Sequence, residues 1–217
     1  MTDDIIREID EEVRRDQYIK LAKRYAPQLT AAAIVLVLAA GGFAGWQKYK
    51  AYRAEQEAKQ FAQAMTLESD KKVKEAAEAF RTLSQQSATG YRALAGFQAA
   101  AARAEQGDVG AAVALYDGMA SDSAIEPRFR DLARLLAVLH LMDTASPEQL
   151  DERLQPLLGK DSIWQYSARE LAALVRLKAG DTAGARKAFA ALSDDLAAPS
   201  DLRSRATELL AALQDAS

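Results

Sequence analysis

Residues 104–120, AEQGDVGAAVALYDGMA, and residues 176–192, RLKAGDTAGARKAFAAL, repeat one pattern. Each copy has a Gly-Asp pair, then a small residue, an aromatic residue four positions later and an apolar residue three beyond that. The residues are Gly107, Ala112, Tyr116 and Met119 in one copy and Gly180, Ala185, Phe189 and Leu192 in the other. The spacing i, i+4, i+7 places three side chains on one helix face. Each copy therefore predicts a turn followed by a helix with one buried face.

The triplet occurs twice more, the second time in a degraded form. These copies are Ala76, Phe80 and Leu83, and Leu150, Leu154 and Leu157. Ala76 and Ala112 are 36 residues apart, and Ala112 and Ala185 are 73 apart, close to twice that spacing. Turn residues divide the chain after residue 51 into short helices, and no stretch alternates as a strand would.

A repeat of this length resembles tetratricopeptide-type helical hairpins, which stack into a solenoid. The small residue lets the preceding helix approach closely, and the aromatic residue fills the space between hairpins. The fold class expected is all-α, with a last helix at about residues 199–213 capping the stack. A generic helical bundle is the alternative.

Residues 25–47 contain no Asp, Glu, Lys or Arg. A helix of that length is roughly 35 Å long, enough to cross a hydrocarbon core of about 30 Å. No polar stripe interrupts residues 31–40, which argues against a buried core helix. Candidate interfacial anchors flank the run: Lys20, Lys23, Arg24 and Tyr25 before it, and Trp46, Lys48, Tyr49, Lys50 and Tyr52 after it. We expect a transmembrane helix over residues 25–49.

A cleaved signal peptide is the alternative for this run, because small residues at 40–42 could be a cleavage site. Signal peptides begin with a short basic region, whereas residues 1–24 carry seven acids and six bases. We therefore expect the segment to be retained, with residues 50–217 as the following domain. The slight excess of Lys and Arg before the run favours a cytoplasmic N-terminus.

Two features near the N-terminus are candidate contact surfaces. Residues 1–24 have apolar residues at helical spacing, and this amphipathic segment could lie on an anionic leaflet, dock on a partner or pair with its own copy. Pro27 is expected to separate that segment from the span. Gly41 and Gly45 form a GxxxG spacing that would let another membrane helix approach closely.

The composition argues against catalysis and nucleic-acid binding. Residues 51–217 carry 20 bases and 24 acids, a charge of −4, and the chain has no cysteine. His140 is the only histidine, and a lone histidine on an apolar helix is most often a packed or rim residue. No phosphate loop, nucleophile elbow or zinc motif is present. We expect no enzymatic activity, no metal and no cofactor.

Aligning Gly107 with Gly180 as hairpin turns predicts two inward-facing stripes on the first helices of two hairpins. The stripes are Leu94, Phe97, Ala101 and Glu105, and Ser167, Glu170, Leu174 and Lys178. First helices line the concave surface of tetratricopeptide stacks, so these residues are candidates for protein binding. The alternative is that Phe97 and Leu174 are ordinary core residues.

Three segments in order resemble one family over essentially the whole chain. They are a membrane span ending GFAGWQKYK (42–50), GYRALAGFQAAAARAEQGD (90–108) and WQYSARELAALVRLKAGDTAGARKAFAAL (164–192). This order is similar to that of the YfgM family, ancillary subunits of the SecYEG translocon in Gram-negative inner membranes. The resemblance implies a cytoplasmic N-terminus, a periplasmic tetratricopeptide-like domain, association with SecYEG and the periplasmic chaperone PpiD, and help for emerging secreted proteins.

The function expected is therefore that of a non-enzymatic adaptor that presents a groove to protein partners. The alternative is a structural role. In that role the chain would be an envelope scaffold, dimeric if it pairs with itself. It would join cell-division or outer-membrane assembly machinery and would bind no clients.

Overall fold

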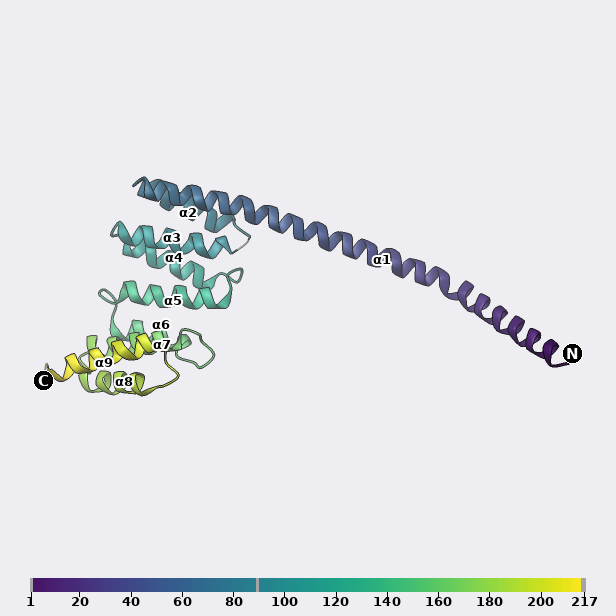
Figure 1. Ribbon diagram of the computed structural model, residues 1–217. Coiled ribbons are helices and arrows are strands. Elements are labelled where there is room, and N and C mark those ends of the chain that lie inside the picture. Colours follow the sequence, from purple (N-terminus) through teal and green to yellow (C-terminus); the bar gives the residue numbers. More distant parts are fainter. Residues whose placement is uncertain (1, 89, 216–217) are drawn as a thin grey trace. The chain divides into compact units, whose positions relative to one another are not determined.

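The computed structural model describes residues 2–88 and 90–215, and among residues 2–33 it describes the side chains of Tyr25, Gln28 and Thr30 only. These residues form helices joined by turns, with no strand in the described part of the chain (Figure 1). The helices are α1 (Thr2–Ser69), α2 (Val73–Gln86), α3 (Tyr91–Glu105), α4 (Val109–Ser121), α5 (Pro127–Leu141), α6 (Pro147–Leu154), the 3₁₀ helix η1 (Gln155–Leu157), α7 (Gln165–Lys178), α8 (Thr182–Asp194) and α9 (Ser200–Asp215). The all-α expectation is confirmed.

The chain divides into two compact units, Met1–Arg53 and Ala54–Ser217. In the first unit α1 continues without a break through Pro27, so the separation expected at that proline is wrong. A proline inside a helix removes one backbone hydrogen bond, a cost that a long helix can tolerate. Ile34, Leu38 and Phe43 are exposed along this part of α1.

Among the side chains that are described, no helix carries a stretch both long and apolar enough to cross a membrane. The expected span also includes residues 26, 27, 29 and 31–33, whose side chains lie outside the described part, as do all side chains of the N-terminal segment 1–24. Apart from the adjoining residues and backbone of α1 itself, no described atom lies within 4 Å of the place that a Cβ would occupy at Gly41 or Gly45. That face of α1 is open, and its contact with another helix stays a prediction.

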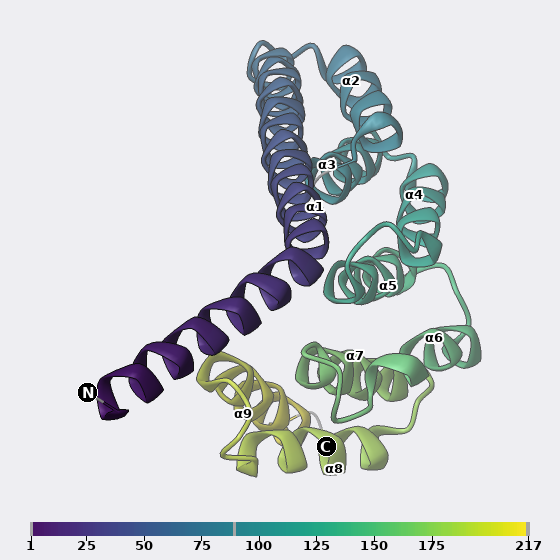
Figure 2. The same cartoon turned by 90° about the vertical axis from the view of Figure 1, so that its right-hand side faces the viewer.

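The second unit is a stack of four helical hairpins and a final helix. Residues 54–69 of α1 pair with α2, and the later hairpins are α3–α4, α5–α6 and α7–α8. Figure 2 shows α3, α5, α7 and α9 along the inside of an arc and α2, α4, α6 and α8 along its outside. We call these the inner and outer layers, and we count residues 54–69 of α1, the first helix of the first hairpin, with the inner layer. Contacts of α3 with α5, α5 with α7 and α7 with α9 join the inner layer.

The repeated triplet forms the buried face of the outer layer, as the spacing predicts. All twelve of its side chains are buried: Ala76, Phe80, Leu83, Ala112, Tyr116, Met119, Leu150, Leu154, Leu157, Ala185, Phe189 and Leu192. Phe80 packs with Ala64 of α1 and Ala95 of α3, and Phe189 packs with Ala173 of α7 and Ala206 of α9. Each aromatic ring therefore fills the space between its own hairpin and the next.

The predicted Gly-Asp turns are present and explain why the helices stop and restart there. Gly107 and Gly180 have φ of 79° and 80°, a left-handed conformation that residues with a Cβ adopt at a cost. Asp108 accepts a hydrogen bond from the Ala111 amide at 3.1 Å, and Asp181 accepts one from the Gly184 amide at 2.8 Å. Glycine ends one helix and aspartate caps the start of the next.

Replacing Phe189 with alanine should lower the free energy of unfolding by about 3–5 kcal/mol, because it empties a fully buried ring-sized volume between two hairpins. Lys187→Ala, at an exposed position two residues away, should change it by less than about 0.5 kcal/mol. Urea denaturation followed by circular dichroism measures both. Equal stability of the two variants would contradict the repeat packing.

Candidate protein-binding surface

The inner layer exposes three large apolar side chains. They are Met65 of α1, Leu94 of α3 and Leu139 of α5, with 39–52% of their surface accessible to solvent. Gln98 lies one turn from Leu94, and its Nε2 is 3.5 Å from Met65 Sδ, so the exposed faces of the first two hairpins adjoin. We call Met65, Leu94 and Leu139 the inner apolar residues. The sequence pattern identified only Leu94 among them.

The first predicted stripe divides between surface and core. Leu94 and Glu105 are exposed, whereas Phe97 is partly buried. The Phe97 ring centroid lies 6.3 Å from that of Tyr116 and 6.4 Å from that of Phe129. Phe97 therefore packs between α3, α4 and α5. Its role in binding stays a prediction, and its ring is already in contact with the chain's own helices.

The second predicted stripe largely contacts neighbouring helices. Leu174 packs against two core clusters, on α5–α6 and on α8–α9. Glu170 accepts two hydrogen bonds from Arg205, at 2.8 and 3.0 Å, and Lys178 Nζ donates to the Met142 carbonyl at 2.6 Å. Any partner that binds these residues would compete with contacts between hairpins.

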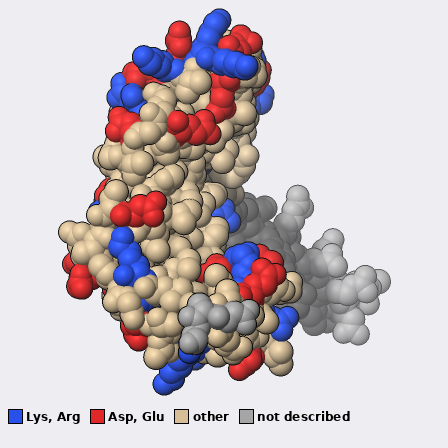
Figure 3. All heavy atoms as spheres, turned by 90° about the vertical axis from the view of Figure 1, so that its left-hand side faces the viewer, with Lys and Arg blue, Asp and Glu red and all other residues tan. Residues whose placement is uncertain are grey.

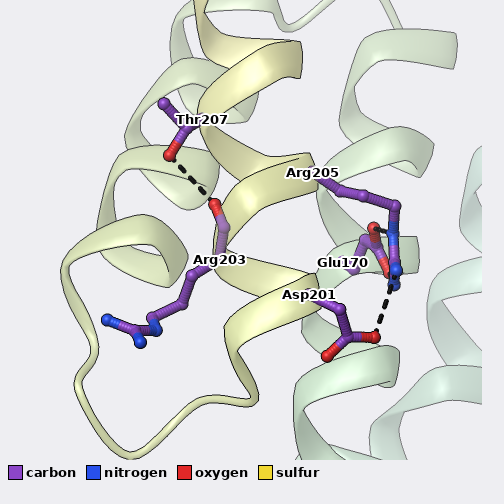
Figure 4. A network of polar contacts seen from close by, with 5 residues as sticks. All are labelled: Glu170, Asp201, Arg203, Arg205 and Thr207. Atoms are coloured by element: carbon purple, nitrogen blue, oxygen red, sulfur yellow. Dashed lines mark hydrogen bonds and ion pairs between the residues drawn. The ribbon is translucent and has the colours of Figure 1, made fainter.

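Four polar contacts between successive hairpins, or between the last hairpin and α9, follow the period of the repeat. The partners lie 35 or 36 residues apart: Asp117–Arg153, Arg128–Trp164, Met142–Lys178 and Glu170–Arg205. Figure 4 shows the last of these, with Arg205 of α9 turned toward Glu170 and Asp201 while the side chain of Arg203 points away. The sequence analysis did not find these pairs. Asp117–Arg153 and Glu170–Arg205 join opposite charges one repeat apart, which is a usable signal, whereas Arg128 and Met142 contribute only their backbone carbonyls.

Two carboxylates hold equivalent loops that lead from one hairpin to the next. Asp122 accepts a hydrogen bond from the Ala124 amide at 2.8 Å and pairs with Arg92 at 2.8 Å. Asp195, 73 residues later, accepts one from the Ala197 amide at 3.0 Å and pairs with Arg169 at 3.4 Å. The Ala124 amide, followed by the Arg92 guanidinium, lowers the pKa of Asp122.

Asp122→Asn should destabilise the protein by about 1–2 kcal/mol at neutral pH, since it weakens a charge-assisted contact that holds a loop. The pKa of Asp122 is lower in the folded protein than in the unfolded chain, where it is about 3.9. The ionised carboxylate therefore stabilises the fold above the unfolded pKa, and this stabilisation is lost as the pH falls through the folded-state pKa. The stability difference from wild type should therefore shrink below about pH 4. Denaturation at several pH values tests this. A pH-independent difference, or an equal loss in the exposed control Asp143→Asn, would contradict it.

Two hollows between inner and outer helices occur at equivalent positions of the repeat. One, of about 300 Å³, lies among α2, α3 and α4 and includes Gly96 and Gly118. The other, of about 350 Å³, lies among Leu158, α7 and α8 and includes Arg169 and Ala191. Gly96 and Arg169, and likewise Gly118 and Ala191, are 73 residues apart. No residue of the two predicted stripes lines either hollow.

The described side chains form no centre that suggests catalysis. His140 is half-buried and stacks on Tyr116, with ring centroids 5.6 Å apart and an interplanar angle of 15°. This is the packed environment expected for it. Within the described residues, no group of three or more His, Asp or Glu side chains could hold a metal ion. On the face seen in Figure 3, acidic and basic residues are interspersed.

Comparisons with known proteins agree with this architecture. The family model described as "Tetratricopeptide repeat-like domain" matches residues 21–212. The nearly identical TPR-like repeats of a Podosopora anserina protein assigned as a kinesin light chain are similar in structure, with a TM-score of 0.53, 16% identity, and coverage of 73% of this chain and 85% of that one. A single-substitution variant of those repeats gives a TM-score of 0.54 with the same identity and coverage. No curated protein matches the chain.

Proposed function

We propose that this chain, which belongs to the tetratricopeptide repeat-like domain family, is a membrane-anchored adaptor of the Sec translocon that binds protein partners through its inner layer. Folds of this family are typically non-catalytic scaffolds for protein–protein interaction, and their stacked hairpins offer extended concave surfaces. The observation that carries the proposal is the exposure of Met65, Leu94 and Leu139 on the inner layer, which leaves apolar surface for a partner to cover.

The partners proposed are SecYEG, a PpiD-like periplasmic chaperone and emerging secreted proteins. Support for them is the resemblance of residues 42–50, 90–108 and 164–192 to the YfgM family. An unfolded secreted chain exposes apolar side chains along an extended backbone. A surface of separated apolar residues can bind many such chains, because it does not require one particular sequence.

The anchor proposed is a helix over residues 25–49, with residues 1–24 in the cytoplasm and residues 50–217 in the periplasm of a bacterial inner membrane. The uncharged run at 25–47 and the family resemblance support this arrangement. Protease treatment of right-side-out spheroplasts should degrade the C-terminal domain and leave a small protected N-terminal fragment. A domain that resists protease there, or a mature N-terminus near Phe43, would contradict the anchor.

Photo-crosslinking tests the partners. A crosslinking amino acid at Leu94 or Leu139 should capture translocon subunits, a PpiD-like chaperone or secreted chains in transit. Ala114, exposed on α4 of the outer layer, is the matched control and should capture far less. Capture of one folded assembly protein alone would instead support the structural scaffold role.

Substitutions should separate binding from stability. Leu94→Ser with Leu139→Ser removes exposed apolar surface, so capture should fall several-fold while the melting temperature changes by at most about 2 °C. Phe97→Ser with Leu174→Ser removes core contacts and should lower stability and capture together. Thermal melting and crosslinking of both double variants make the comparison. Unchanged capture by Leu94→Ser with Leu139→Ser would exclude the inner apolar residues as the binding surface.

A further inference from the structure

Residues 46–53 of α1 carry aromatic and basic side chains over about 200° of the circumference of the helix, and Gln47 and Ala51 occupy the remaining side. Trp46, Tyr49 and Tyr52 are 53–60% exposed, and Lys48 and Lys50 are exposed as well. The Trp46 and Tyr49 rings are 6.1 Å apart, and Lys50 Nζ lies 5.5 Å from the Trp46 ring centroid. We call Trp46, Lys48, Tyr49, Lys50 and Tyr52 the collar.

The collar has two aromatic–lysine pairs on different sides of the helix. Trp46 and Lys50 are four residues apart and share one side, and Lys48 and Tyr52 are also four residues apart. Since successive residues turn by about 100°, Lys48 lies about 160° from Trp46 around the axis. A protein partner normally contacts one stripe of a helix, whereas a bilayer interface surrounds the helix. The collar covers about 200° of the helix, which is wider than one such stripe of about 100°, and this breadth fits a bilayer interface.

The charge around the collar has a single sign. The last acid before it is Asp16 and the next after it is Glu55, so residues 17–54 carry six Lys or Arg and no Asp or Glu. Tyrosine and tryptophan rings favour the depth of lipid headgroups, and lysine extends its ammonium from that depth toward phosphate. At 1.5 Å per residue the collar is about 10 Å long, enough to cross the headgroup region of one leaflet, which is about 5–8 Å deep.

We infer that the collar binds the headgroups of anionic phospholipids at the outer surface of the bilayer. This inference rests on the membrane anchor proposed above. It adds a lipid preference, in which Lys48 and Lys50 attract phosphatidylglycerol-type headgroups while Trp46, Tyr49 and Tyr52 fix the depth of the helix. The preference weakens at high salt, because screening reduces the attraction between exposed charges.

Quenching of Trp46 fluorescence by brominated lipids tests the preference. The full chain is reconstituted into phosphatidylcholine vesicles with a minor fraction of phosphatidylglycerol, and either lipid is supplied in brominated form. The signal of the second tryptophan, Trp164, is measured in the Trp46→Phe variant and subtracted. Brominated phosphatidylglycerol should quench Trp46 about two- to fivefold more than its mole fraction predicts. This excess should disappear in Lys48→Gln with Lys50→Gln.

Lys72→Gln with Lys74→Gln removes the same charge from exposed positions with the same spacing and should keep the excess. An excess that survives Lys48→Gln with Lys50→Gln, or equal quenching by both lipids in the wild-type chain, would overturn the lipid preference and leave the anchor intact. A chain that floats with vesicles without quenching by either lipid would place the collar against protein and overturn the inference. A chain that does not float with vesicles would overturn the anchor as well.

Discussion

The packing of a small, an aromatic and an aliphatic residue on each outer helix is the interaction on which the stack depends. Phe80 and Phe189 are fully buried, yet no single hairpin supplies all the atoms that bury them, because each ring also touches the next inner helix. A hairpin that folded alone would expose this face to water. Formation of a hairpin and its stacking on a neighbour are therefore a single event, as in other solenoids.

The stack could be predicted from the sequence because its signals are short-range. The i, i+4, i+7 triplet lies within two helical turns, and the glycine and aspartate of a turn act on the backbone beside them. Even the degraded copy at Leu150, Leu154 and Leu157 is fully buried. The prediction was wrong at Pro27. The local rule that a proline interrupts a helix predicted a break there, but α1 continues through this residue.

The candidate surface was harder to predict, since a helical pattern identifies a face but not what covers it. Leu94 and Phe97 are three residues apart and share one side of α3, yet Leu94 is exposed and Phe97 meets α4 and α5. Glu170 and Lys178 follow the inward spacing, but α9 and the end of α5 supply them with partners 35 and 36 residues away. Such coverage depends on how the next repeat is placed, which no single helix encodes.

The pattern of contacts also determines the order in which the domain can assemble. The helix pairs in extensive contact within the described chain are neighbours in sequence or are separated by one helix, such as α5 and α7. The first hairpin can therefore complete most of its contacts before the last has been synthesised. A chain synthesised from its N-terminus onward can fold hairpin by hairpin, without waiting for its C-terminus. In that order α9 arrives last and covers Phe189, whose ring would otherwise remain partly open to solvent at the growing end.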